Sequence, residues 1–153
     1  MTCRKGTELT PTRVKKLEQR WETVFTKWEK ILKIHDHTSF FYFEKEDVLK
    51  DNNDHPTVVT VFTNGRYLEA RFHIYLKVLT HLDYDEFENV VVHELLHMKN
   101  SLIEVWKDDV LDHVSKSSRA GWKRYYKTVD ENFTEQMAIV LLALEKKSRK
   151  GKK

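Results

Sequence analysis

The sequence predicts a single α+β domain, because apolar residues at helical spacing flank a middle region of alternating β-branched and aromatic residues. The chain has 153 residues, the size of one domain with one core. Its composition, 40% hydrophobic and 33% charged, excludes a disordered chain. We expect the order helix, three strands, helix, irregular connection and helix.

An N-terminal helix is predicted over residues 11–34. The hydroxyl of Thr10 can cap the first turn, and Pro11 stands at the helical position that proline tolerates best. The apolar residues that follow recur at steps of three and four and should cover one face of the core. They are Val14, Leu17, Trp21, Val24, Phe25, Trp28, Ile31 and Leu32.

Three strands are predicted over residues 38–44, 57–63 and 66–76. Asn64-Gly65 separates the last two, and this dipeptide is a strong hairpin signal because both residues tolerate positive φ. We therefore expect a small, mainly antiparallel sheet that contains a hairpin. The core-facing side of the last strand should carry Ala70, Phe72, Ile74 and Leu76.

Two more helices are predicted after the strands. Asp83 and Glu86 have capping-box spacing ahead of an apolar helical pattern that includes VVVHELLHMKN. Residues 108–124 are polar and are interpreted as an irregular connection. The final helix is predicted over residues 129–147, where a strong apolar stripe ends in positive charges that suit the helix dipole.

The domain is expected over residues 1–147, followed by a basic flexible tail over residues 148–153. The formal net charge of +3 is modest, and the ending KKSRKGKK is more often a solvated end than a nucleic-acid site, so nucleic acid is the weaker candidate partner. The sequence shows neither a signal peptide nor an apolar run long enough for a bilayer, and the lone Cys3 cannot form an internal disulfide. We expect a cytoplasmic protein without a membrane partner; no oligomeric state is indicated.

The segment HELLH has the spacing of a catalytic zinc site. On a helix, His93 and His97 lie one turn apart on the same face, so both imidazoles can bind one ion. Glu94 lies about 100° around the helix from His93, where its carboxylate can act as general base toward a water that zinc activates. The alternative is a helix that carries two histidines without metal; the leucines at both variable positions and the preceding valines favour the site.

A catalytic zinc needs a third protein ligand. The long metzincin motif does not fit, because Asn100 stands at its glycine position and Ile103 at its histidine position. The final predicted helix offers Glu131 and Glu135, which lie one turn apart on one face.

With HELLH followed by ENFTEQMA, roughly residues 67–144 resemble the gluzincins, the thermolysin-like clan of zinc peptidases, and especially their small single-domain forms. The resemblance implies a minimal zincin-like fold, with Glu131 as the third ligand and Glu135 as the acidic residue that orients a ligating histidine. The family usually has aspartate at the position of Glu135, which leaves open the reverse assignment, with Glu135 as ligand. It also implies that the strand EARFHIYL is an edge strand that pairs with extended peptide substrate.

Three further residues are candidates for the site. His113 follows His97 at a separation similar to that of SprT-like proteases, which complete zinc with a third histidine. It is therefore a candidate ligand, a candidate transition-state donor or an ordinary loop residue. Tyr125 and Tyr126 are candidate donors to an oxyanion or packing residues.

The sequence thus predicts a zinc metallopeptidase with one zinc per chain, held by His93, His97 and Glu131, and with Glu94 as general base. The substrates would be peptides or proteins cleaved within the chain, because no exopeptidase anchoring motif is present. The alternative is a zinc-stabilised binding module without turnover, which would use its basic tail to guide a protein or nucleic-acid partner.

Overall fold

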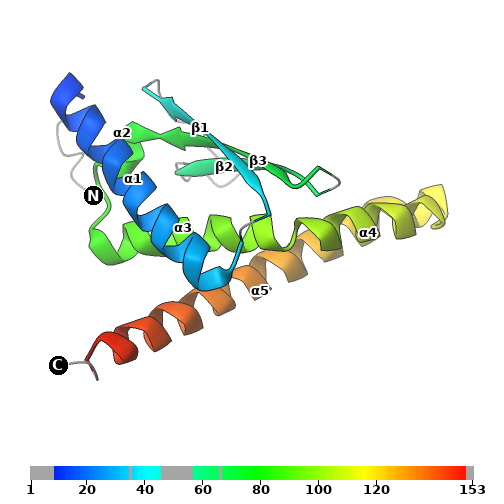
Figure 1. Cartoon of the computed structure of the whole chain (residues 1–153). Helices are drawn as coiled ribbons and strands as arrows, with labels where there is room; N and C mark the ends of the chain where they lie inside the picture. The colour runs from blue at the N-terminus through cyan, green and yellow to red at the C-terminus, as the bar shows by residue number, and fades with distance from the viewer. Residues whose placement is uncertain (1–8, 35, 46–56, 66, 151–153) are drawn as a thin grey trace, which may run out of the picture.

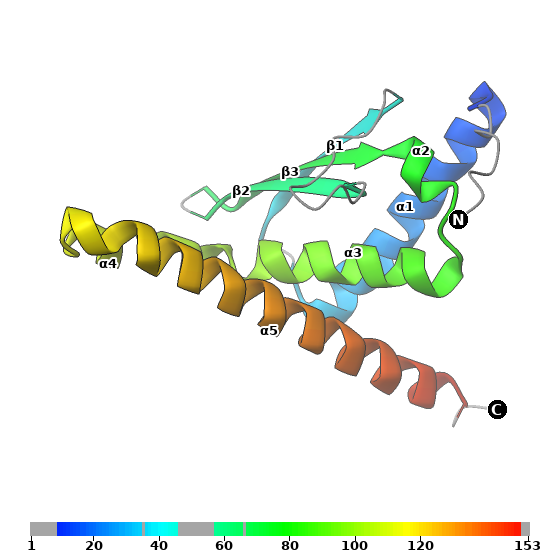
Figure 2. The same ribbon diagram turned by 180° about the vertical axis from the view of Figure 1, so that it is seen from behind.

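The computed structural model describes residues 9–34, 36–45, 57–65 and 67–150. Within these residues the fold is α+β, as predicted, and the helices lie on one side of a three-stranded mixed sheet (Figures 1 and 2). The elements are α1 (Pro11–Leu32), β1 (Thr38–Glu44), β2 (Val59–Asn64), β3 (Glu69–Tyr75), α2 (Leu76–Leu79), α3 (Tyr84–Lys99), α4 (Ser101–Asp112) and α5 (Lys116–Lys150).

The sheet has the order β1-β3-β2, with β1 parallel and β2 antiparallel to β3. The prediction of a mainly antiparallel sheet is therefore wrong for one of the two strand pairs. Strands β1 and β3 are not consecutive in the chain. No turn sequence connects them directly, so the sequence does not predict that they pair. The strand EARFHIYL, expected at the edge, is the central strand, and β2 is the edge strand on its antiparallel side.

The connection between β2 and β3 is longer than the predicted two-residue turn. Asn64 pairs with Glu69, and Leu68 has a positive φ of 52°. Gly65 meets a different requirement: a Cβ atom there would lie 2.4 Å from the carbonyl oxygen of Ser101. Glycine at this position therefore lets the end of the hairpin approach the first residue of α4.

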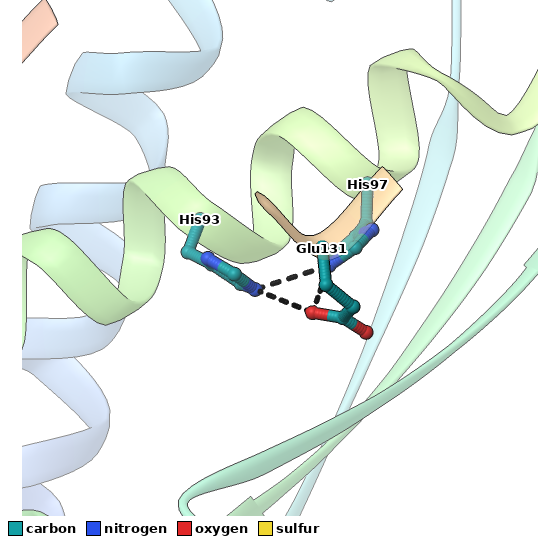
Figure 3. Close-up of side chains that lie close together, drawn as sticks. All are labelled: His93, His97 and Glu131. Carbon is teal, nitrogen blue, oxygen red and sulfur yellow. Dashed lines mark hydrogen bonds and ion pairs between the residues drawn. The ribbon is translucent and has the colours of Figure 1, made fainter. Parts of the chain in front are cut away.

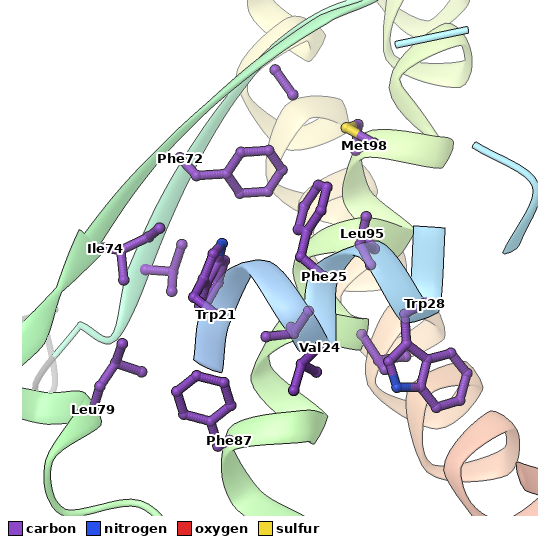
Figure 4. Close-up of a cluster of buried hydrophobic side chains, with 14 of the residues drawn as sticks. Trp21, Val24, Phe25, Trp28, Phe72, Ile74, Leu79, Phe87, Leu95 and Met98 are labelled. Carbon is purple, nitrogen blue, oxygen red and sulfur yellow. The ribbon is translucent and has the colours of Figure 1, made fainter. Parts of the chain in front are cut away.

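The core lies between the sheet and the two helices α1 and α3 (Figure 4). Trp21 is fully buried, with its ring centroid 6.1 Å from that of Phe87 on α3 and 6.4 Å from that of Phe72 on β3. The predicted inward face of the last strand is confirmed, and so is the predicted apolar face of α1 apart from Ile31, which is exposed. Fully buried on that strand face are Ala70, Phe72, Ile74 and Leu76.

Residues 108–124, predicted as irregular, are largely helical: α4 continues to Asp112, and α5 begins at Lys116. Arg119 stabilises the turn between them, since its guanidinium donates to the carbonyls of Asp112 and Val114. Most side chains of this segment are exposed, so the helices carry no continuous buried stripe that a sequence pattern would reveal. None of the described helices is long and apolar enough to cross a membrane.

The C-terminal end of α5 contacts α3, and residues 148–150 of the predicted flexible tail belong to this helix. Helix α5 continues to Lys150, and residues 151–153 lie outside the described part of the chain. Lys146 Nζ lies 2.6 Å from Asp85 Oδ2, and Arg149 Nη2 donates to Glu88 Oε1 at 3.2 Å. The basic charges at the end of α5 therefore position this helix against α3.

Glu88 joins three helices through one buried carboxylate. Its Oε1 accepts hydrogen bonds from Lys27 and Trp28 of α1, the latter at 2.8 Å, and from Arg149 of α5. Burial alone would raise the pKa of Glu88, but the hydrogen bonds from Lys27 and Trp28 and the nearby positive charges outweigh it, so its pKa is lowered. The carboxylate is therefore ionised in the folded protein at neutral pH.

We expect Glu88→Ala to lower the free energy of unfolding by about 3 kcal/mol, because the buried Trp28 indole N–H loses its acceptor and Lys27 and Arg149 each lose one of two carboxylate partners, the other being Glu145. Glu88→Gln, which keeps an acceptor, should cost about 1 kcal/mol. Urea unfolding at pH 7 measures the free energy of unfolding of both variants, and equal effects would contradict the role of the indole bond.

The stabilisation by the Glu88 charge depends on pH. Because folding lowers the pKa of Glu88, this stabilisation is present above the usual value of 4.5 and is lost as the pH falls through the folded pKa. The difference between wild type and Glu88→Gln should therefore shrink on acidification.

Candidate metal centre

Helix α3 presents the two histidines of HELLH to a cavity because its other side is anchored in the core. The helix begins with a capping box, in which Asp83 Oδ1 accepts from the Glu86 backbone N–H and Glu86 Oε2 accepts from that of Asp83. Its buried residues include Val91, Val92, Leu95, Leu96 and Met98. The opposite face carries His93, Glu94 and His97, which line the cavity.

The cavity has a volume of about 920 Å³ and lies between β2, α3, α4 and α5. Edge strand β2 contributes Val59, Thr60, Val61 and Thr63 to its wall. Helix α5 lies across α3 and brings its own polar residues to the same space (Figure 1). The histidines thus line a groove along one side of which runs the edge of β2 that pairs with no other strand among the described residues.

Three side chains meet in this groove: His93 and His97 of α3 and Glu131 of α5 (Figure 3). The two histidine Nε2 atoms are 3.0 Å apart. Glu131 Oε2 lies 3.5 Å from each of them. Residues from two distant parts of the sequence therefore direct one ligand atom each toward a common point.

The separations of these atoms fit one zinc ion. Ligand atoms about 2.0–2.1 Å from a tetrahedral zinc lie about 3.4 Å from one another. The observed separations of 3.0, 3.5 and 3.5 Å are close to that value. Two imidazoles and one carboxylate are also the donor set of known catalytic zinc sites, which leave the fourth position open. His93, His97 and Glu131 would hold such an ion.

The carboxylate that contacts His97 on its second ring nitrogen is that of Asp130, a residue other than Glu135, for which the orienting role is predicted. Asp130 Oδ2 lies 3.2 Å from His97 Nδ1, the ring nitrogen that does not face Glu131. Glu135 lines the cavity one turn further along α5. The sequence gives no local signal for Asp130, because its approach to His97 depends on how α5 is rotated against α3.

We expect Asp130→Asn to weaken zinc binding about 10- to 100-fold, the effect of losing a carboxylate that orients a ligating histidine. Asp130 has only 15% of its side chain exposed, so this pair is partly protected from solvent. Competition with a chromogenic chelator would measure the affinity. Asp108→Asn is the matched control, since it removes one carboxylate from the same cavity; an equal effect of both changes would contradict the specific role of Asp130.

The ionisation of the acidic residues is set by burial and by the histidines. Burial raises the pKa of Glu94 to about 7, although the charges of His93 and His97 act in the opposite direction. Hydrogen bonds from the two histidines hold the pKa of Glu131 well below its usual range. Burial would lower the pKa of His97, but its hydrogen bond to Glu131 and the charges of Glu94, Glu131 and Asp130 raise it. The site thus combines an ionised ligand with a carboxyl group that can exchange a proton near neutral pH.

The structure separates the remaining candidates. Tyr126 lines the cavity, whereas Tyr125 is exposed and packs against Trp122 at 6.1 Å between ring centroids. His113 is the exposed C-cap residue of α4, at the far end of that helix from α3 (Figure 1), and does not line the cavity. Neither Tyr125 nor His113 is therefore placed to act at the histidines.

Comparisons with known proteins find no match: no family model, curated protein or solved structure is significantly similar to this chain. The class of protein is therefore described from its fold and its site. The chain is an α+β protein in which two histidines and a glutamate that could hold a metal ion open onto a groove.

Proposed function

We propose that this protein is a zinc-dependent peptidase that cleaves within peptide or protein chains. The observation that carries the proposal is the meeting of His93, His97 and Glu131 at separations that fit zinc. Glu94 lies beside them in the same groove. A carboxyl group beside a metal-activated water is what hydrolysis uses as general base.

The chain's own residues supply the steps of hydrolysis. Zinc bound at the site would lower the pKa of a water molecule and polarise the substrate carbonyl. Glu94 would accept a proton from the attacking water and pass it to the leaving amine, for which a pKa near neutral is suited. Asp130 holds the His97 ring in position.

The free edge of β2 would hold the substrate. In the described part of the chain, β2 pairs with β3 on one side only, and its residues line the groove beside the histidines. An extended peptide can hydrogen-bond to such an edge as an additional strand. This role, expected for the strand EARFHIYL, is therefore assigned to β2.

The test uses the wild-type protein purified without added metal. We expect about one zinc per chain by elemental analysis, and hydrolysis of a denatured protein that a chelator abolishes and added zinc restores. Zinc binding without hydrolysis of any of several unfolded substrates would favour the zinc-stabilised binding module. Absence of zinc binding even after incubation with the metal would contradict both functions.

A further inference from the structure

The face of α5 that lines the groove has an ordered row of charges. Lys123, Lys127, Glu131 and Glu135 follow one another at four-residue spacing, and all four line the groove. Four residues advance a helix by about 6 Å. The row therefore places two positive charges on one side of the candidate metal ligand Glu131 and one negative charge on the other.

The two lysines of this row are not neutralised by the acidic residues of the site. Asp130 and Glu131 contact the histidines, and no carboxylate pairs with Lys123 or Lys127 among the residues that the structure describes. Lys107 of α4 lines the same end of the groove, where its Nζ lies 4.7 Å from the Tyr126 ring centroid and 3.9 Å from Asp108 Oδ1. This end of the groove is thus positive, although Asp108 also faces it.

The direction of β2 decides which end of a peptide would reach the lysines when the peptide pairs antiparallel with this strand, the slightly more stable pairing per residue. Gly65, directly after β2, contacts Ser101 at the start of α4, so the C-terminal end of β2 lies at the α4 end of the groove. Lys107 of α4 and Lys123 and Lys127 of α5 line the groove. Helix α4 and the first half of α5 lie toward this end of β2 (Figure 2). A peptide that pairs antiparallel with β2 therefore places the residues before the cleaved bond beside the lysines.

The spacing of the row gives the positions. An extended peptide advances about 3.4 Å per residue, so the distance of about 6 Å along α5 from Glu131 to Lys127 corresponds to at most about two residues of peptide. Lys123, about 12 Å away, corresponds to three or four residues.

We infer that the groove selects acidic peptide segments, with aspartate or glutamate two to four residues before the cleaved bond. The inference rests on the proposed function, because it uses the same groove and the same zinc position. It adds the substrate class, which is set by Lys123 and Lys127, and it predicts no preference for acidic residues after the cleaved bond, where Glu135 faces the groove.

Binding tests the inference independently of turnover. The zinc-loaded Glu94→Gln variant would be titrated into a fluorescent peptide with three consecutive glutamates near its N-terminus, into the same peptide with glutamines, and into one with the glutamates moved to the C-terminal half. We expect the first to bind about five- to tenfold more tightly than the other two, the effect of two exposed ion pairs. Adding Lys123→Ala and Lys127→Ala should remove this difference, and adding Lys123→Glu and Lys127→Glu should reverse it.

The matched control adds Lys116→Ala and Arg124→Ala, which remove two charges from exposed positions on the same helix outside the groove and should leave the difference intact. Zinc binding and hydrolysis without preference for the first peptide would overturn the inference and leave the proposed function standing. Tighter binding of the first peptide, without hydrolysis by the wild type, would support a groove that binds acidic segments and would overturn the proposed peptidase function. An equal loss in the control variant would overturn the inference, because it would show attraction by overall charge alone.

Discussion

Glu94→Gln is expected to lower kcat/KM for an unfolded protein substrate about 100- to 10,000-fold, the usual contribution of a general acid–base group. The zinc content should stay at the wild-type value, since the histidine and glutamate ligand atoms are unchanged. Glutamine keeps the size of the side chain and its acceptor oxygen but cannot take a proton from water. A fluorogenic protein substrate and elemental analysis on the same preparation measure the two quantities together.

The pH profile separates this role from a structural one. Because a general base acts in its ionised form, activity should rise with pH through the pKa of Glu94, which burial raises to about 7 in the metal-free site. A bound divalent cation favours the ionised carboxylate, so the rise should be centred below pH 7. Glu94→Gln should lose this rise, whereas Glu22→Gln on the exposed side of α1 should keep it. Full activity of zinc-loaded Glu94→Gln would exclude Glu94 as the base.

The parts of the fold that the sequence predicted correctly have strong local signals. The first helix, the strand over residues 38–44 and the capping box of α3 follow from spacing and from short-range hydrogen bonds. The turn after Asn64 was predicted too short, because Gly65 is required by its contact with α4 and not by a positive φ. The sequence alone does not distinguish a glycine required by a close contact from one required by a positive φ.

The parts that could not be predicted depend on contacts between distant elements. The parallel pairing of β1 with β3 has no turn between the two strands. Residues 108–124 are largely helical, with mostly exposed side chains and no continuous buried stripe, and this segment also carries Lys123 to the groove. At the site, the helical pattern brought His93 and His97 to one face. Which carboxylates of α5 contact the two histidines depends on how α5 is rotated against α3. No short stretch of the sequence determines this rotation.

Glu131→Ala is expected to weaken zinc binding more than 100-fold, beyond the effect of losing a residue that only orients a ligand. Glu135→Ala should leave the affinity within about threefold of wild type, because Glu131 Oε2 already lies 3.5 Å from both histidine Nε2 atoms. The two glutamates are one turn apart on α5 and both line the groove, so each is the control for the other.

The competing assignment, with Glu135 as ligand, would require α5 to slide along its own axis by four residues, about 6 Å, relative to α3. Such a shift would break the contacts of α5 with α3 through Lys146 and Arg149 and would move Asp130 away from His97 Nδ1. Chelator competition measures zinc affinity in both variants, and circular dichroism confirms that both are folded. The result decides whether α5 places Glu131 or Glu135 at the histidines. Loss of zinc with Glu135→Ala and retention with Glu131→Ala would show that the helix occupies the shifted position when metal is bound.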